Sequence, residues 1–113
     1  MARRDDLNLI RGTLDLLILK AVAFEPRHGY GVVRWIAKQT RDELQIDDGA
    51  LYTALHRLEQ RRLLKSKWGM SETQRRAKFY ALTAKGRRQL AKSERTWNRY
   101  AAAMSRVMTA KSG

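Results

Sequence analysis

Apolar residues recur at three- and four-residue spacing in four parts of the chain, which is the pattern of amphipathic helices. These parts are residues 8–24, 30–40, 49–61 and 83–108. Residues 64–70 and 77–82 instead alternate or are rich in aromatic side chains, which favours two strands. The pattern predicts a mainly α fold with a small β-hairpin in front of the last helix.

The first predicted helix is apolar around most of its surface. Leu14, Leu17 and Ala21 belong to one stripe, and Leu16 and Leu19 widen it. A helix of this kind is buried on two sides. We expect one side to face the core of its own chain and the other to face a second subunit.

Two breaks flank the second predicted helix. The first contains Pro26 and Gly29, which interrupt helices. His28 between them has no partner at metal-ligand spacing, so we interpret it as a turn residue that contacts the backbone. Residues 44–46 in the second break alternate briefly and predict a very short strand. Three helices within about fifty residues indicate a helix-turn-helix core.

The third predicted helix has a narrow apolar face and a polar face. Leu51, Leu55 and Leu58 form the apolar stripe, and Asp47 and Asp48 suit the N-terminus as caps and as partners of the helix dipole. The other face carries Gly49, Tyr52, Thr53, His56, Arg57 and Gln60. Such a helix suits insertion into a DNA major groove, and an ordinary solvated surface helix is the alternative.

The loop of the predicted hairpin is polar and ends with basic residues. Arg75, Arg76 and Lys78 lie beside the turn. A helix-turn-helix followed by a hairpin with a basic tip is a winged helix. Arginine side chains at such a tip can reach a neighbouring minor groove or the phosphates.

The last predicted helix has an apolar stripe that one small domain cannot cover. Thr83 can cap it, and its roughly 26 residues would span about 39 Å. The exposed stripe predicts a dimer, and folding back on the same core is the alternative. The expected interface residues are Leu16, Leu19, Leu90, Trp97, Tyr100, Ala101, Met104 and Met108.

Composition places the chain among globular proteins of one domain. It has 113 residues, of which 43% are hydrophobic and 31% charged, and it contains no cysteine. Disulfides and thiolate metal sites are therefore excluded. The longest apolar run, residues 14–24, is broken by Asp15 and Lys20 and is too short for a bilayer. We expect a cytoplasmic protein with residues 1–82 as a winged-helix domain and 83–113 as a dimerisation helix and tail, in one compact unit.

The excess of positive over negative charge lies entirely in the second half of the chain. Residues 1–56 hold eight Lys/Arg and eight Asp/Glu, whereas residues 57–113 hold sixteen and three, so the second half carries the whole net charge of +13. This asymmetry favours a polyanion as partner. Solubility alone would not require such segregation.

The sequence contains no signature of an enzyme. It has no glycine-rich phosphate loop, no His/Cys/Glu cluster at metal spacing and no nucleophile with an evident base. We therefore expect no catalytic residue, no metal and no cofactor.

Four pieces of the sequence, in this order and spacing, resemble the short PadR-family transcriptional regulators. They are GTLDLLIL at 12–19, HGYG at 28–31, the stretch 49–59 that opens with GALY, and RRAKFYALT at 75–83. The resemblance extends from about Leu9 to Leu90. It implies a winged-helix homodimer whose C-terminal helix packs on the partner's first helix. It also implies repression through a roughly palindromic operator, sometimes relieved by a small molecule.

Two positions depart from the pattern of that family. Thr53 stands where the family usually has proline after its Leu-Tyr pair, and Arg62 stands where it usually has glycine at the end of the third helix. Thr53 leaves the helix N-terminus less preorganised but offers a hydroxyl to DNA. Arg62 leaves the position of the helix end open.

The leading hypothesis is a dimeric, sequence-specific repressor that binds double-stranded DNA. Tyr52, Thr53, His56 and Gln60 are the candidates for contacts at or near bases. The candidates for phosphate contacts are Arg34, Lys38, Arg57, Arg75, Arg76 and Lys78. A basic, non-specific nucleic-acid-binding protein of the nucleoid or RNA-binding type is the alternative, and a ligand-sensing protein without DNA binding is a third.

Three aromatic residues fall outside the main core stripes. If Trp35, Trp97 and Tyr100 met at the dimer interface, they could line a pocket for a small hydrophobic effector. Ordinary packing is the favoured interpretation, because aromatic side chains at helical spacing are mostly found in cores and interfaces.

Overall fold

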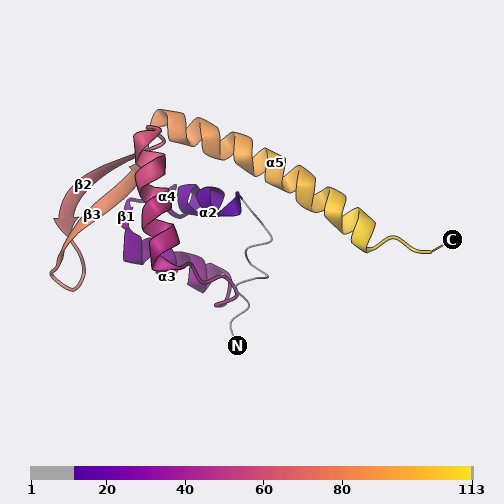
Figure 1. The fold of residues 1–113 in the computed structure, drawn as a ribbon, viewed down its shortest axis with the longest axis horizontal. Coiled ribbons are helices and arrows are strands. Elements are labelled where there is room, and N and C mark those ends of the chain that lie inside the picture. The colour runs from indigo at the N-terminus through magenta and orange to yellow at the C-terminus, as the bar shows by residue number, and fades with distance from the viewer. Residues whose placement is uncertain (1–11, 113) are drawn as a thin grey trace.

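The computed structural model describes residues 12–112 and consists of four helices and a small antiparallel sheet (Figure 1). The elements in chain order are α2 (Thr13–Ala21), β1 (Arg27–His28), α3 (Gly29–Gln39), α4 (Asp48–Gln60), β2 (Leu64–Met70), β3 (Arg76–Leu82) and α5 (Ala84–Met108). Helices α2, α3 and α4 form a bundle, the hairpin β2–β3 lies at one side of it, and α5 extends away on the other side (Figure 1). This is the mainly helical winged-helix arrangement that the sequence predicts.

Helix α2 is shorter at its C-terminal end than predicted. It ends at Ala21, and residues 22–24 form a turn closed by backbone bonds from Val22 to Ile18 and from Ala23 to Lys20. The proline at position 26 follows at once and disfavours a longer helix. Residues 8–11 of the predicted helix lie outside the described residues.

Side-chain caps start the three later helices where the sequence predicts them. His28 Nδ1 accepts a hydrogen bond from the backbone N–H of Gly31, Asp47 Oδ2 accepts one from Ala50, and Thr83 Oγ1 accepts one from Gly86. Each cap satisfies a backbone donor that has no partner within its helix. The hydrogen bond of His28 agrees with its prediction as a turn residue that contacts the backbone.

The end of α4 is defined by a backbone motif that closes over Arg62. Arg62 adopts a left-handed conformation with φ of 63°, its N–H bonds to the Glu59 carbonyl, and the N–H of Leu63 bonds to the Leu58 carbonyl. These two bonds make a Schellman motif, which usually has glycine at the left-handed position. The helix therefore ends at Gln60 despite an arginine where glycine would be less strained.

The sheet contains a strand that the sequence pattern missed. The missed strand is β1, and the strand order of the sheet is β1-β3-β2. Leu64 lies opposite Leu82 in the hairpin, and Arg27 of β1 lies opposite Tyr80 of β3. The short strand predicted at residues 44–46 is wrong: this segment pairs with no strand, and Thr40 Oγ1 accepts the Leu44 N–H instead. Three alternating residues form a strand only where a sheet edge lies within reach, and β3 offers its edge to residues 27–28.

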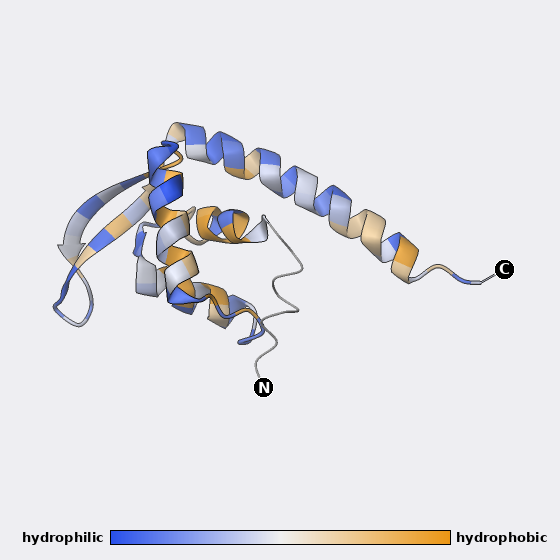
Figure 2. Ribbon diagram, viewed as in Figure 1, coloured by the Kyte–Doolittle hydropathy of each residue, from blue (hydrophilic) through white to orange (hydrophobic). Residues whose placement is uncertain are grey.

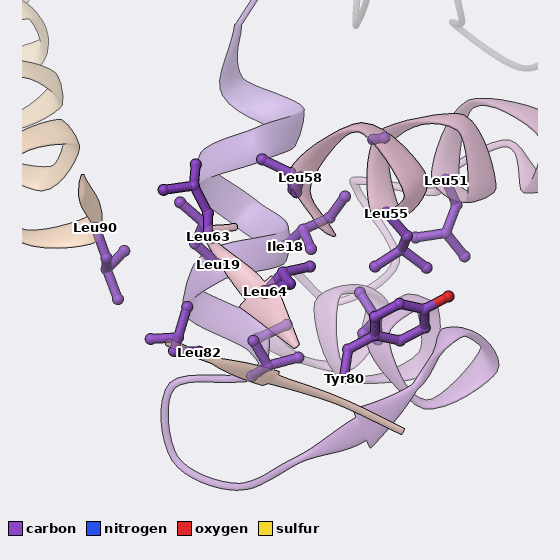
Figure 3. Packing of buried hydrophobic residues seen from close by; sticks show 14 of the residues in the cluster. Ile18, Leu19, Leu51, Leu55, Leu58, Leu63, Leu64, Tyr80, Leu82 and Leu90 are labelled. Atoms are coloured by element: carbon purple, nitrogen blue, oxygen red, sulfur yellow. The ribbon is translucent and has the colours of Figure 1, made fainter. Parts of the chain in front are cut away.

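The core lies between the three-helix bundle, the hairpin and the start of α5 (Figure 3). Ile18 and Leu19 of α2 lie at its centre. The other large side chains that are almost completely buried are Val32, Ile36, Leu51, Leu55, Leu58, Leu63 and Leu64. In Figure 2 the hydrophobic positions of α2 and α4 gather on the inner side, whereas most of α5 is hydrophilic until its last turns. No helix among the described residues is long and apolar enough to cross a membrane.

Candidate nucleic-acid interface

Helix α4 presents one polar face to solvent. Leu51, Ala54, Leu55 and Leu58 are buried against the bundle. The side chains on the outer side are those that the sequence singled out, and all are exposed: Tyr52, Thr53, His56 and Gln60. This face carries hydrogen-bonding groups and little charge, which suits contacts with base edges better than contacts with phosphates.

The N-terminus of α3 holds Tyr52 in place. The Tyr52 ring lies directly over Gly29, so closely that a Cβ atom at Gly29 would be 2.7 Å from Tyr52 Oη. The neighbouring Tyr30 ring is stacked with His28 and lies under the guanidinium of Arg34. The absence of a side chain at Gly29 thus allows the Tyr52 ring to lie against the start of α3.

Arg57 of α4 is already engaged within the chain. Its guanidinium forms an ion pair with Asp15 of α2. This contact helps to join α4 to α2 and partly compensates the charge. Arg57 is therefore less available to a phosphate than those predicted cations that form no ion pair among the described residues.

The hairpin projects beside α4 and carries cations at its tip. The turn is closed by a backbone hydrogen bond in which the Ser71 N–H donates to the Arg75 carbonyl. Arg75 is exposed, and the guanidinium of Arg76 lies 4.7 Å from the centre of the Trp68 ring. Trp68 itself is 56% exposed. A stacked arginine keeps its charge while its orientation is restricted.

Glu59 joins α4 to both strands of the hairpin. Its carboxylate accepts a hydrogen bond from Ser66 Oγ of β2 at 2.5 Å and forms an ion pair with Lys78 Nζ of β3 at 3.2 Å. The Ser66 bond is the largest cause that lowers the pKa of Glu59, Lys78 adds to it, and partial burial opposes both. The same lysine lies over the ring of Tyr80, whose pKa is raised mainly by burial.

A second feature is an apolar groove of about 860 Å³ between α2 and α5. Seven of the eight predicted interface residues line it: Leu16, Leu19, Trp97, Tyr100, Ala101, Met104 and Met108. Tyr100 is 57% exposed and Met108 is 70% exposed. The single chain therefore leaves a long apolar face of α5 in solvent.

Comparison with known proteins identifies the family. The family described as Transcriptional regulator PadR-like matches residues 18–92. The chain belongs to the PadR-like family of transcriptional regulators. An uncharacterized protein from Lysinibacillus sphaericus is 30% identical over 97 residues, which are 86% of each protein. This membership agrees with the resemblance seen in the sequence, and its members are regulators rather than enzymes.

Solved structures of regulators have the same fold. A PadR family regulator from Eggerthella lenta is 30% identical with a TM-score of 0.78, over 96% of this chain and 92% of that one. A transcriptional regulator from Clostridium thermocellum is 27% identical with a TM-score of 0.78, over 88% and 93%. A PadR-like regulator from Bacillus cereus has a TM-score of 0.79 over 92% and 99%, and at 21% identity it shows the fold alone.

The predicted site residues of this PadR-like chain fall into separate groups. The α4 face and the hairpin cations lie on neighbouring elements, and Arg34 and Lys38 are exposed on α3. Leu90 is not part of the groove, because its side chain is buried in the core. Trp35 is also absent from the groove lining: it packs against Phe24 and lies under the guanidinium of Arg27. Within one chain, the three aromatic residues predicted to line an effector pocket are not together.

Sequence reasoning missed two residues of this region. Trp68 stacks on Arg76 although seven residues separate the two along the chain, and Glu59 joins α4 to the hairpin. The register of the hairpin would have indicated the first, since Trp68 opposes Lys78 and Met70 opposes Arg76 on one face. The role of Glu59 depends on the angle between helix and hairpin, which no local pattern specifies.

Replacing Gly29 with alanine should displace the Tyr52 ring. The added methyl group would overlap the ring, which is 52% exposed and can turn toward solvent, so we expect a loss of unfolding free energy below the roughly 1–3 kcal/mol of overpacking in a core. NMR of the tyrosine ring and denaturant unfolding measure both effects. Gly31→Ala is the matched control, because the nearest atom to its Cβ would be His28 Cε1 at 3.4 Å, an ordinary contact distance. An unshifted Tyr52 ring in Gly29→Ala would contradict the assignment.

Replacing Glu59 with glutamine should destabilise the fold only where the carboxylate is ionised. Because the pKa of Glu59 is lowered on folding, its stabilisation is present above the unfolded pKa and is lost as pH falls through the folded pKa. At pH 7 we expect a loss of about 0.5–1 kcal/mol of unfolding free energy. The difference should vanish well below the ordinary glutamate pKa of about 4.3.

Denaturant unfolding of the wild type and the Glu59→Gln variant, at pH 7 and at a pH well below the ordinary glutamate pKa, measures this difference. Glu72→Gln removes an exposed carboxylate from the loop of the same hairpin and should change little at either pH. A Glu59 effect of equal size at low pH would show that the ion pair is not its source.

Proposed function

We propose that this PadR-like regulator is a cytoplasmic homodimer that binds a roughly palindromic operator in double-stranded DNA and represses transcription. Helix α4 would enter the major groove, and the hairpin would act as the wing on the minor groove or the phosphates. The observation that carries the proposal is the uncharged polar face of α4 beside a hairpin tipped with arginine. Contacts with bases would then come from α4, and contacts with phosphates would come from the hairpin.

The groove between α2 and α5 supports the dimer. A stable monomer rarely leaves a contiguous apolar face of this kind in solvent. A second copy that places its own α5 in the groove would cover Trp97, Met104 and Met108, which are otherwise partly or largely exposed. A two-fold dimer places two α4 helices in symmetric positions, which requires a symmetric operator. We propose a second copy, rather than a small effector, as the principal occupant of the groove.

The α4 face distinguishes this proposal from a non-specific nucleic-acid protein. A protein that binds only through charge needs cations along the contacting helix. On α4, however, Arg57 is paired with Asp15, and Glu59 is paired with Lys78 of the hairpin. The remaining outer side chains of α4 are therefore suited to the hydrogen-bonding groups of the bases rather than to the charge of the phosphates.

Selection of bound duplexes from a random library tests the function. We expect one enriched sequence with two inverted half-sites about one helical turn apart, as a two-fold dimer requires. Light scattering of the free protein should give twice the mass of one chain. Enrichment without a common sequence would favour the non-specific alternative, and no bound duplex would remove DNA binding from the proposal.

Variants of the wing and of α4 should affect DNA binding in different ways. The double change Arg75→Ala and Arg76→Ala should weaken binding to all duplexes and reduce the salt slope of log affinity by about 2, since each phosphate contact contributes about 0.9. Gln60→Ala or His56→Ala should instead change the selected sequence and leave the salt slope nearly unchanged. Anisotropy titrations at several salt concentrations measure both. An unchanged affinity of the wing variant would show that the wing assignment is wrong.

A further inference from the structure

A straight row of cations runs along the outer side of α5. Its members are spaced four, three, four and seven residues apart, which places them on one face of a helix with 3.6 residues per turn. They are Arg88, Lys92, Arg95, Arg99 and Arg106, and all five are exposed. We call these five residues the α5 stripe. It spans about 27 Å at 1.5 Å per residue.

The charges of the α5 stripe are not compensated within the described part of the chain. None of the five forms an ion pair there. The only acidic residue of α5, Glu94, is turned to the other side and pairs with Lys20 of α2 at 2.9 Å. Exposed cations arranged in a row without counter-charges attract a polyanion and repel other cationic surfaces.

Apart from Lys92, which borders the groove, the α5 stripe lies opposite the face of α5 that lines the groove. At 100° per residue, Arg88, Arg95 and Arg99 are about half a turn away from Trp97 and Met104. A second copy seated in the groove would therefore leave the stripe exposed. The stripe also runs away from the hairpin, because α5 extends to the opposite end of the molecule (Figure 1).

The side chains around the stripe are small. Ala91, Ala102 and Ala103 lie next to its cations and are exposed. They allow a phosphate backbone to approach the helix closely. A helix that lies on a membrane surface instead carries large apolar side chains beside its cations, whereas on α5 Trp97, Tyr100, Met104 and Met108 line the groove.

We propose that the α5 stripe is a second, sequence-independent binding surface for the phosphate backbone of double-stranded DNA, separate from α4 and the wing. Its length matches about eight base pairs of duplex at 3.4 Å each. A dimer that holds its operator through α4 and the wing would then bind another stretch of DNA along the outer side of each α5. Such a surface would raise the local concentration of the regulator near its site and would join two DNA segments.

A capture experiment tests the second surface. The protein is saturated with an immobilised selected duplex, and binding of a labelled random-sequence duplex of 20 base pairs is measured at low salt. The test variant is Arg88→Gln, Arg95→Gln and Arg99→Gln; Lys92 is retained because it also borders the groove. We expect the wild type to capture the second duplex and the variant to bind it about tenfold more weakly, with a salt slope lower by about 3.

A control variant removes the same charge elsewhere. Lys65→Gln, Arg87→Gln and Lys111→Gln lower the net charge equally but leave the stripe intact, and all three side chains are exposed. We expect this variant to capture the second duplex within about twofold of the wild type, and the stripe variant to bind the first duplex normally. Circular dichroism and light scattering confirm that both variants remain helical and of unchanged mass.

Three results would overturn the proposal. The first is failure of the wild type to capture a second duplex. The second is an equal loss of affinity for the second duplex in the stripe variant and the control variant. The third is binding of the stripe to phosphatidylserine vesicles in place of duplex DNA. If selection yields no preferred duplex, the same two variants are compared on random duplex alone in the Arg75→Ala, Arg76→Ala background. The stripe is then judged independently of the function proposed for α4.

Discussion

The burial of α2 on two sides is the constraint on which the rest of the structure depends. One side of this short helix supplies Ile18 and Leu19 to the core shared with α3 and α4, and the other side faces α5. It also anchors charged residues of both neighbours, because Asp15 pairs with Arg57 of α4 and Lys20 pairs with Glu94 of α5. The position of the polar α4 face and the direction of α5 are thus both set against one apolar helix.

The structure separates charge from hydrogen-bonding capacity. The outer face of α4 is polar but almost uncharged, whereas the hairpin tip and the outer side of α5 hold unpaired cations. Glu59 contributes to this division, since it compensates Lys78 and fixes the hairpin against α4 through Ser66. In the DNA-binding role proposed for this regulator, this arrangement would allow specificity and electrostatic attraction to vary independently, because they would reside in different elements.

Most elements could be predicted because their signals are local. His28, Asp47 and Thr83 cap the helices that follow them, and a cap needs only a side chain and a backbone N–H three residues away. The hairpin followed from alternation on both sides of a polar loop. The strand predicted at residues 44–46 was wrong and β1 was missed, because a two-residue strand exists only through the partner that it meets.

The sequence by itself determined the order of the helices and the hairpin, their periodic apolar faces, the location of the excess positive charge and the family, since each depends on residue type and spacing alone. Only the tertiary structure decided which charges are already paired, that Gly29 supports the Tyr52 ring, that Leu90 belongs to the core and that Trp35 lies away from the groove. These outcomes depend on how helices far apart in sequence pack against each other. Packing angles arise from the whole core, so no local pattern contains them.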